Sequence, residues 1–385
     1  MIPYGRQDIS ETDIEAVVEV LRSDFITQGP RVPHFEQAIA DYCSVSYGIA
    51  VNSGTSALHI ACMALELGPG DVLWTSPNTF VASANCALYC GADVDFVDID
   101  SRTLNISIEA LENKLIEAEK IGRLPKIIVP VHFAGQSCDM KEIRSLGDKY
   151  NFRIIEDASH AIGGKYYDQL IGGCQYSDIT VFSFHPVKII TTGEGGLLTT
   201  NNEELATKLQ RYRSHGITRD PAVMTKESDG PWYYQQQELG YNFRMTEMQA
   251  ALGLSQLGRI QEFVDRRNSL AERYSKLLSA LPIQVQYVNK YCNSAYHLYV
   301  LRILLNKVQK SRKEIFEYLR DAGIGVNVHY IPVHTQPYYK SLGFNEGDFP
   351  ESEKYYREAF SIPMFPGITN EQQDYVVEKL RAIVQ

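Results

Sequence analysis

The sequence lacks the features that mark membrane, secreted and disulfide-rich proteins. It has no run of 18 apolar residues and no apolar secretory segment at its N-terminus, so we expect neither a membrane span nor export. Its seven cysteines are an odd number, are scattered along the chain and include no Cys-X-X-Cys pair. We therefore expect buried free thiols in a reducing cytoplasm.

A metal site is not expected either. Cys86 and Cys90 have the i, i+4 spacing that places two side chains on one face of a helix. No histidine lies close to them in the sequence, and buried thiols at helical spacing are much commoner than a metal pair. We therefore predict that the chain binds no metal.

Positive charge is scarce, since 37 Lys and Arg face 47 Asp and Glu and the net charge is −10. This balance opposes nucleic-acid binding, so a phosphorylated ligand must be held locally by backbone N–H groups and a few side chains. With 44% hydrophobic and 22% charged residues over 385 positions, the composition is that of a globular protein with one large and one smaller domain.

From about residue 37 to 215, short apolar runs alternate with segments of helical periodicity. Strands are expected at 47–51, 72–74, 94–98, 126–132, 152–155, 179–183 and 196–200, and helices at 54–67, 79–90, 108–120 and 139–150. Strand–helix–strand alternation with apolar strands predicts an α/β fold, with a mainly parallel central sheet flanked by helices on both faces.

After residue 245 the pattern changes, and we predict a large domain over 1–245 and a smaller α+β domain over 246–385. The smaller domain is expected to contain a single bridging helix at 246–281, a strand at 297–304, a helix at 311–322, a strand at 324–329 and two C-terminal helices. Residues 217–240 are typical of a long surface excursion. A loop of that length is usually functional or lies at an interface.

The most informative pair of residues is Lys188 and Asp157. Lys188 lies in a loop before the glycine-rich turn 193–196, and Asp157 ends a buried strand. A lysine can form a Schiff base with an aldehyde, and a carboxylate can keep a pyridine nitrogen protonated; pyridoxal phosphate (PLP) chemistry needs both. Each residue also has a plain interpretation, an exposed loop lysine and a helix-capping aspartate.

A phosphate site is indicated by the turn 52–58, which joins a strand to a helix. Its backbone N–H groups face outward at the positive end of that helix, beginning at Gly54, and the hydroxyls of Thr55 and Ser56 add donors. Ser183, at the end of the strand that leads to Lys188, is a further donor. Taken alone, the turn is more typical of an ordinary capped connection between a strand and a helix.

Two aromatic residues complete the pattern. Phe80 opens the next helix, where its ring could lie flat on a pyridine, although most such residues are core aromatics. His160, three residues past Asp157, can face the same pocket and contact the ring hydroxyl, although a lone histidine there is more often structural. No single residue is specific, but the ordered set is.

The order and wording of these motifs resemble the DegT-type sugar-nucleotide aminotransferases, PLP enzymes of the aspartate-aminotransferase-like fold (fold type I). The resemblance spans essentially the whole chain. The matching segments are Ser53-Gly54-Thr55-Ser56-Ala57-Leu58, Asn78-Thr79-Phe80-Val81-Ala82, Glu156-Asp157-Ala158-Ser159-His160-Ala161, Ser183-Phe184-His185-Pro186-Val187-Lys188 and Gly240-Tyr241-Asn242-Phe243-Arg244-Met245. Dehydratases of the family, which carry histidine in place of the lysine, are excluded by Lys188.

The resemblance implies a role for each residue of the cofactor site. Lys188 would carry PLP and Asp157 would pair with its ring nitrogen, while His160 would lie beside the ring. The cofactor contacts implied are Gly54, Thr55, Ser56, Phe80, Asp157, His160, Ser183, Lys188 and Asn242. Asn242 would reach the phosphate of the neighbouring subunit, which implies a homodimer with shared active sites.

Within the family, residues 185–192 resemble the enzymes that aminate a 4-keto-6-deoxy UDP-N-acetyl-hexosamine on the route to pseudaminic acid, with L-glutamate as the amino donor. By this likeness the N-terminal segment 1–35 lines the substrate site. The implied substrate contacts are Tyr4, Asp24, Phe25, Ile26, Thr27, Ser53, Ser183, His185, Asn242, Val328, His329, Tyr330 and Ile331.

Three other functions fit part of this pattern. An aminotransferase acting on another 3- or 4-keto UDP- or dTDP-sugar would carry the same motifs. A desulfurase or an amino-acid lyase of related fold is a second alternative; a desulfurase would need a reactive loop cysteine, and none of the seven cysteines sits in an evident one. A non-catalytic regulator built on this fold would be expected to lose Lys188 or Asp157, and both are present.

Overall fold

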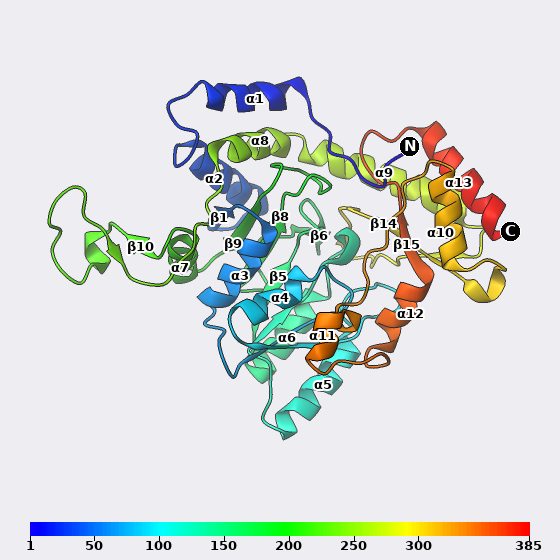
Figure 1. Cartoon of the computed structure of the whole chain (residues 1–385), viewed down its shortest axis with the longest axis horizontal. Coiled ribbons are helices and arrows are strands. Elements are labelled where there is room, and N and C mark those ends of the chain that lie inside the picture. Colours follow the sequence, from blue (N-terminus) through cyan, green and yellow to red (C-terminus); the bar gives the residue numbers. More distant parts are fainter.

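The computed structural model describes all residues 1–385, and its centre is a seven-stranded sheet (Figure 1). In spatial order its strands are β1 (Tyr47–Val51), β9 (Gly196–Thr200), β8 (Ile179–Ser183), β5 (Arg153–Asp157), β4 (Ile127–Val129), β2 (Val72–Thr75) and β3 (Asp93–Phe96). Only β9 runs against the others, because it pairs antiparallel with both of its neighbours. The predicted mainly parallel sheet is confirmed.

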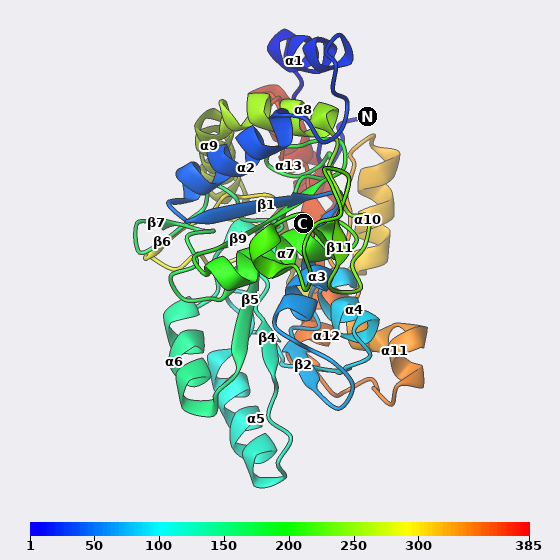
Figure 2. The same cartoon turned by 90° about the vertical axis from the view of Figure 1, so that its left-hand side faces the viewer.

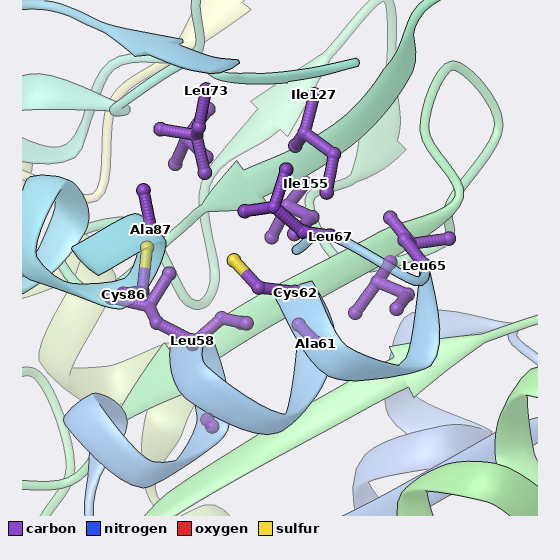
Figure 3. Packing of buried hydrophobic residues seen from close by; sticks show 14 of the residues in the cluster. Leu58, Ala61, Cys62, Leu65, Leu67, Leu73, Cys86, Ala87, Ile127 and Ile155 are labelled. Carbon is purple, nitrogen blue, oxygen red and sulfur yellow. The ribbon is translucent and has the colours of Figure 1, made fainter. Parts of the chain in front are cut away.

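Helices cover both faces of this sheet, as Figure 2 shows from the side. One face carries α3 (Gly54–Ala64), α4 (Ala82–Tyr89) and α7 (Glu203–Arg213), and the other carries α2 (Arg31–Cys43), α5 (Ile108–Lys120) and α6 (Met140–Tyr150). Successive residues of a strand point to opposite faces, so Ile155 packs with the α3 and α4 side chains and Ile154 with those of α5 and α6. Figure 3 shows the first of these cores.

The C-terminal part contains a second core around a three-stranded antiparallel sheet. Its strands are β12 (Ile283–Val285), β14 (Tyr299–Ile303) and β15 (Ala359–Ile362), and its helices are α9 (Ile260–Leu278), α10 (Arg312–Asp321), α11 (Pro337–Ser341), α12 (Pro350–Glu358) and α13 (Asn370–Val384). The first half of α9 packs on the large sheet and the second half on this core. The boundary at 245/246 stays a prediction.

The single helix expected at 246–281 is wrong, because the structure has two helices, α8 (Glu247–Leu257) and α9. They are separated at Gly258 and Arg259. Glycine is a poor helix former, and the Arg259 guanidinium is drawn to Asp8 and Asp13 at 2.7 Å each. These ion pairs fix the N-terminal segment, with its helix α1 (Glu11–Leu21), against α8.

Two further C-terminal expectations are corrected. No regular strand forms at 324–329; the segment makes only isolated bridges, Ile324 to Ile2 and Asn327 to Ser361, because the chain start occupies its edge beside Gly325. The helices that follow number three rather than two, and β15 lies between the last two of them. The bridge between Ile2 and Ile324 joins the start of the chain to the C-terminal core.

The excursion at 217–240 projects from the body of the molecule, at the left of Figure 1. It contains the short ribbon of β10 (Ile217–Thr218) and β11 (Gln235–Gln236). Trp232 and Leu239 on this excursion are 72% and 74% exposed, which is unusual for large apolar side chains. A three-stranded ribbon of β13 (Cys292–Asn293), β6 (Lys165–Tyr166) and β7 (Gln169–Leu170) completes the fold.

None of the helices combines the length and the apolar character that crossing a membrane requires.

Glu247, the first residue of α8, is hydrogen-bonded to the start of α2. We expect Glu247→Gln to destabilise the protein. Its fully buried carboxylate accepts hydrogen bonds from the N–H groups of Arg31 at 2.6 Å and Val32 at 3.2 Å, at the start of α2. Glutamine can accept only one of them, and an unpaired buried N–H costs about 1–3 kcal/mol. Urea unfolding measures this change. Glu262→Gln, at an exposed position of α9, should leave the unfolding free energy nearly unchanged, and equal stability of both variants would contradict this role.

Candidate active site

The lysine loop joins β8 to β9 at the edge where the parallel strands end. Phe184 N donates to Gly195 O at 2.9 Å and Thr192 N to Phe184 O at 3.0 Å, so the two ends of the loop are held together. Lys188 is half-buried in this loop, and its side chain makes no ion pair or hydrogen bond within the chain. Burial lowers the pKa of Lys188 to about 8, although the negative charge of Asp157 opposes this shift.

Asp157 is buried at the end of β5 and is oriented from two sides. Its Oδ2 accepts from Ser83 Oγ on α4 at 2.6 Å, and its Oδ1 accepts from Ser159 N at 3.1 Å. The neighbouring Glu156 points to the opposite face of the sheet, as the alternation of a strand requires. The structure therefore brings Asp157 and Lys188 together on the α4 side.

The predicted phosphate turn begins α3 and leaves several donors free. Ser53 caps the helix, its Oγ accepting from Ser56 N at 3.1 Å. The N–H groups of Gly54 and Thr55 and the hydroxyls of Thr55 and Ser183 have no hydrogen-bond partner within the chain. Ser56 is engaged locally, because its hydroxyl donates to Asn52 Oδ1 at 2.7 Å. An anion can therefore bind to the free donors without breaking an existing bond.

Glycines allow the turn and the lysine loop to approach one another closely. A Cβ atom on Gly54 would lie 3.0 Å from the Cβ of Ser183, and one on Gly196 would lie 2.5 Å from Ser53 O. The hydroxyl of Ser183 thus faces the start of α3, although these residues are far apart in the sequence. This proximity is the observation that best fits a phosphate held between α3 and β8.

His160 has both ring nitrogens satisfied within the chain. Its Nδ1 accepts from Ala134 N at 3.3 Å, so Nε2 carries the hydrogen and donates to Tyr330 Oη at 3.0 Å. Burial, and then the positive charge of Lys188, hold the pKa of His160 well below its usual range, which keeps the ring neutral. The predicted contact with a cofactor hydroxyl stays a prediction.

Tyr4 and His329 form the next part of the cluster, with ring centroids 5.4 Å apart. Gly5, which follows Tyr4, lies against Val187 beside the lysine, since a Cβ on Gly5 would be 3.7 Å from the Cβ of Val187. The chain start therefore reaches the lysine loop, as the predicted role of Tyr4 requires. Burial and the charge of Lys188 lower the pKa of His329 to about 3, so this ring is also neutral.

Phe80 is 58% exposed, and its ring centroid lies 6.2 Å from that of Tyr330. An exposed ring at the start of α4 is available for stacking on a ligand, although the structure does not test that role. Val328 is half-buried and Ile331 is exposed on either side of the His329–Tyr330 pair. His185 is exposed, and its carbonyl accepts from Lys188 N at 2.9 Å.

The remaining predicted residues lie on the surface, and their sequence neighbours line one hollow. Residues 24–27 are all exposed, and Gln28 and Gly29 line a hollow of about 240 Å³ together with Ser214 and Arg244. Asn242 pairs with Ser214 through a backbone bridge; its side chain is exposed and makes no hydrogen bond within the chain. No contact within the chain joins residues 24–27 to Lys188.

Several residues at the site were not predicted. Ser83 holds Asp157, Asn78 Oδ1 accepts from Tyr330 N at 3.3 Å, and the buried ring of His297 lies 4.4 Å from that of His160. Ser83 and Thr79 are four residues apart and hydrogen-bonded at 2.8 Å, so paired hydroxyls at helical spacing were the available signal. Nothing in the sequence around His297 distinguishes it from a core histidine.

Residues 7–381 match the DegT/DnrJ/EryC1/StrS aminotransferase family, which covers almost the whole chain and all of the motifs described above. The chain belongs to this family.

The aminotransferase resembles proteins of several bacteria along their full length. It is 39% identical to the spore coat polysaccharide biosynthesis protein SpsC of Bacillus subtilis, covering 100% of this chain and 97% of SpsC. It is 37% identical to the UDP-4-amino-4,6-dideoxy-N-acetyl-beta-L-altrosamine transaminase of Campylobacter jejuni, covering 100% and 98%. Helicobacter pylori PseC, an aminotransferase involved in the biosynthesis of pseudoaminic acid, superposes with a TM-score of 0.90 at 30% identity, covering 100% and 99%.

The cofactor of this aminotransferase is PLP. The solved structures with the same fold include PLP and PMP forms of Streptococcus pneumoniae Spr1654. The residues of this chain fit the cofactor, because free anion donors, a buried carboxylate and a lysine without an ion-pair partner follow strands at the same edge of the sheet. The site is distinct from a cavity of about 530 Å³ on the opposite face of the sheet, which is lined by Glu156 and the loop around Cys174.

The lowered pKa of Lys188 predicts how the cofactor-free protein takes up PLP. The neutral amine is the nucleophile, and it forms as the pH rises through about 8 instead of about 10.5 for an ordinary lysine. The rate of imine formation at a fixed PLP concentration, followed by visible absorbance, should therefore rise with pH and level off above about 8. A peptide with a solvent-exposed lysine is the control, and a rate that tracks the control would contradict the burial of Lys188.

Proposed function

We propose that the enzyme transfers an amino group from L-glutamate to C4 of a 4-keto-6-deoxy UDP-N-acetyl-hexosamine. The products would be UDP-4-amino-4,6-dideoxy-N-acetyl-beta-L-altrosamine and 2-oxoglutarate, in the pathway to pseudaminic acid. The observation that carries the aminotransferase chemistry is Lys188, half-buried without an ion-pair partner near the oriented carboxylate of Asp157. The sugar is supported by the likeness to the Campylobacter transaminase and to PseC.

The residues divide the work between binding and proton transfer. When bound, PLP supplies an aldehyde that accepts amines and a ring that takes up negative charge. Thr55, Ser183 and the N–H of Gly54 would hold its phosphate at the start of α3. Phe80 would cover the ring. These contacts are the same throughout the reaction and act by retaining the cofactor, so they contribute uniform binding.

Lys188 and Asp157 act on protons. The amine of Lys188, whose pKa is lowered by burial, is suited to remove the proton from Cα of glutamate and later to deliver one to C4 of the sugar. Asp157, held by Ser83 and by the N–H of Ser159, would keep the proton on the pyridine nitrogen. Two buried neutral histidines, His160 and His329, line the cluster without adding a competing charge.

Asp157→Ala should separate cofactor binding from catalysis. The variant should retain much of its PLP, because the donors at the start of α3 remain, but it should lose about 10²-fold or more in the rate of the glutamate half-reaction. Glu156→Gln should be milder, since Glu156 points to the other face of the sheet. Single-turnover absorbance with glutamate measures both, and equal losses in the two variants would overturn the assignment to Asp157.

The substrate is tested by incubating the PLP-loaded enzyme with glutamate and a panel of UDP- and dTDP-keto-sugars. We expect 2-oxoglutarate release and the mass of a 4-amino sugar with the 4-keto-6-deoxy UDP-N-acetyl-hexosamine. Turnover of a different 3- or 4-keto sugar alone would replace this substrate and keep the aminotransferase. The likeness to SpsC, which is named for spore coat polysaccharide biosynthesis, supports a different sugar substrate as the alternative, so the panel includes several keto-sugars.

We also propose that two copies of the chain build each active site. Asn242 is exposed with no side-chain partner, and the flanking Tyr241 and Phe243 rings point away from it, stacking on each other at 4.8 Å beside His59. Large apolar side chains are also exposed on the 217–240 excursion and at Phe25 and Ile26, and exposed apolar surface of this kind is typical of a protein–protein interface. A two-fold dimer would supply one, with each subunit giving and receiving the same segments.

Mixing two inactive variants tests the shared site. Lys188→Ala removes the amine, and Asn242→Asp places a negative charge where a phosphate is expected. If the sites are shared, half of the randomly exchanged dimers contain one intact and one doubly damaged site, so activity should return to about a quarter of wild type. A mixture that stays inactive after verified subunit exchange would show that Asn242 serves its own chain.

A further inference from the structure

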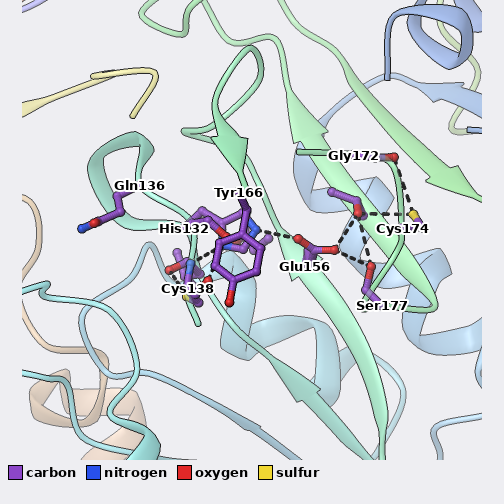
Figure 4. A network of polar contacts seen from close by, with 12 residues as sticks. His132, Gln136, Cys138, Glu156, Tyr166, Gly172, Cys174 and Ser177 are labelled. Atoms are coloured by element: carbon purple, nitrogen blue, oxygen red, sulfur yellow. Dashed lines mark hydrogen bonds and ion pairs between the residues drawn. The ribbon is translucent and has the colours of Figure 1, made fainter. Parts of the chain in front are cut away.

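Glu156 lies back to back with Asp157 on β5 and is almost fully buried on the rear face of the sheet. Its carboxylate accepts three hydrogen bonds, from His132 Nε2 at 2.7 Å, from Thr180 Oγ1 at 3.2 Å and from Ser177 Oγ (Figure 4). Burial alone would raise the pKa of Glu156, but the hydrogen bond from His132, together with those from the two hydroxyls, holds it below the usual range.

His132 is the link between Glu156 and the active-site side of the sheet. Its ring is fully buried, and its Nδ1 accepts from Cys138 N at 3.2 Å. Nδ1 therefore carries no hydrogen, and Nε2 donates to Glu156. The imidazole thus holds both ends of the turn 132–138, since His132 begins this turn and Cys138 ends it.

This turn supplies the contact that sets the state of His160. Ala134, in its middle, has a φ of 59°, in the left-handed region that alanine rarely adopts. In that conformation its N–H donates to His160 Nδ1 at 3.3 Å, which leaves Nε2–H to donate to Tyr330 Oη at 3.0 Å. A backbone held in an unfavourable conformation needs support from its surroundings. Two buried side chains hold this turn: His132, backed by Glu156, and Asn105, which accepts from Phe133 N at 2.9 Å and donates to Gln136 O and Ser137 O.

We propose that Glu156 is a positioning residue: through His132 it holds the turn 132–138 so that Ala134 N–H fixes His160 as its Nε2–H tautomer. The two neighbouring carboxylates of β5 then serve one site from opposite faces, Asp157 directly and Glu156 through the turn. The effect of this tautomer on turnover rests on the proposed function, whereas the tautomer itself does not.

Two variants of Glu156 separate the effect of side-chain length from the effect of charge. Glu156→Gln keeps the length and can still present an oxygen to His132, because the Ser177 and Thr180 hydroxyls can rotate to accept from its amide nitrogen. Glu156→Asp keeps the charge and the hydroxyl partners but is one methylene shorter, so it should lose His132. Thr180→Val is the control, since it removes a partner of Glu156 and leaves the bond to His132 intact.

The test is ¹⁵N NMR of selectively labelled histidine in the full-length PLP-loaded enzyme, with single-turnover kinetics in parallel. In the wild type, His132 and His160 should both show a hydrogen on Nε2 and none on Nδ1. Glu156→Gln and Thr180→Val should retain this pattern. Glu156→Asp should show a mixed tautomer at His160 and a glutamate half-reaction slower by about tenfold, which Glu156→Gln should not show.

A wild-type His160 with its hydrogen on Nδ1, or protonated, would overturn the proposal without any variant. So would an unchanged His160 pattern in Glu156→Asp, or equal disturbance by Glu156→Gln and Glu156→Asp, since charge rather than reach would then be decisive. A changed tautomer with an unchanged half-reaction would overturn the kinetic consequence alone. None of these results depends on which sugar the enzyme uses.

Discussion

The structure depends on the placement of an unpaired lysine beside a buried carboxylate at the carboxyl edge of a parallel sheet. β5 and β8 are neighbours and run in the same direction, so Asp157 at the end of one strand and the lysine loop after the other meet at one edge. Burial of Lys188 lowers its pKa to about 8, which makes a neutral amine accessible near physiological pH. Most other residues of the site hold Lys188 and Asp157 in place or leave donors free for the phosphate of the cofactor.

β5 illustrates how one strand can serve both faces of a sheet. Asp157 faces α4 and is held by Ser83, while Glu156 faces the rear and is held by His132, Ser177 and Thr180. Buried charges are costly unless their hydrogen-bonding capacity is satisfied, and each carboxylate has its own set of donors. The rear set is connected through the turn at Ala134 to His160, so the two faces are linked by hydrogen bonds rather than by packing alone.

Much of the fold could be predicted because its signals are local. Apolar runs bounded by turn residues predicted the seven strands of the sheet, and helical periodicity predicted the helices between them. The break at Gly258 was missed because a single glycine within a periodic segment is a weak signal, and the ion pairs of Arg259 with Asp8 and Asp13 involve residues far away in the sequence. The expected strand at 324–329 failed for a similar reason, since the chain start occupies its edge.

The same division applies to the site. Lys188, Asp157 and the turn at Gly54 could be recognised from residue type and order, and Ser183 lies close to Gly54 as expected. His132 and His297 could not, because what distinguishes them is a partner brought near by tertiary structure. Residues 24–27 and the Asn242 side chain are exposed and make no contact with Lys188 of their own chain, as a shared site in a dimer would require.

The most direct test of the central claim is to locate the cofactor on the wild-type protein. Borohydride reduction of the PLP-loaded enzyme followed by peptide mapping should place the pyridoxyl group on Lys188 alone, because this half-buried lysine has a lowered pKa and no ion-pair partner. A label on another lysine, such as Lys165 on the rear face, would contradict the account.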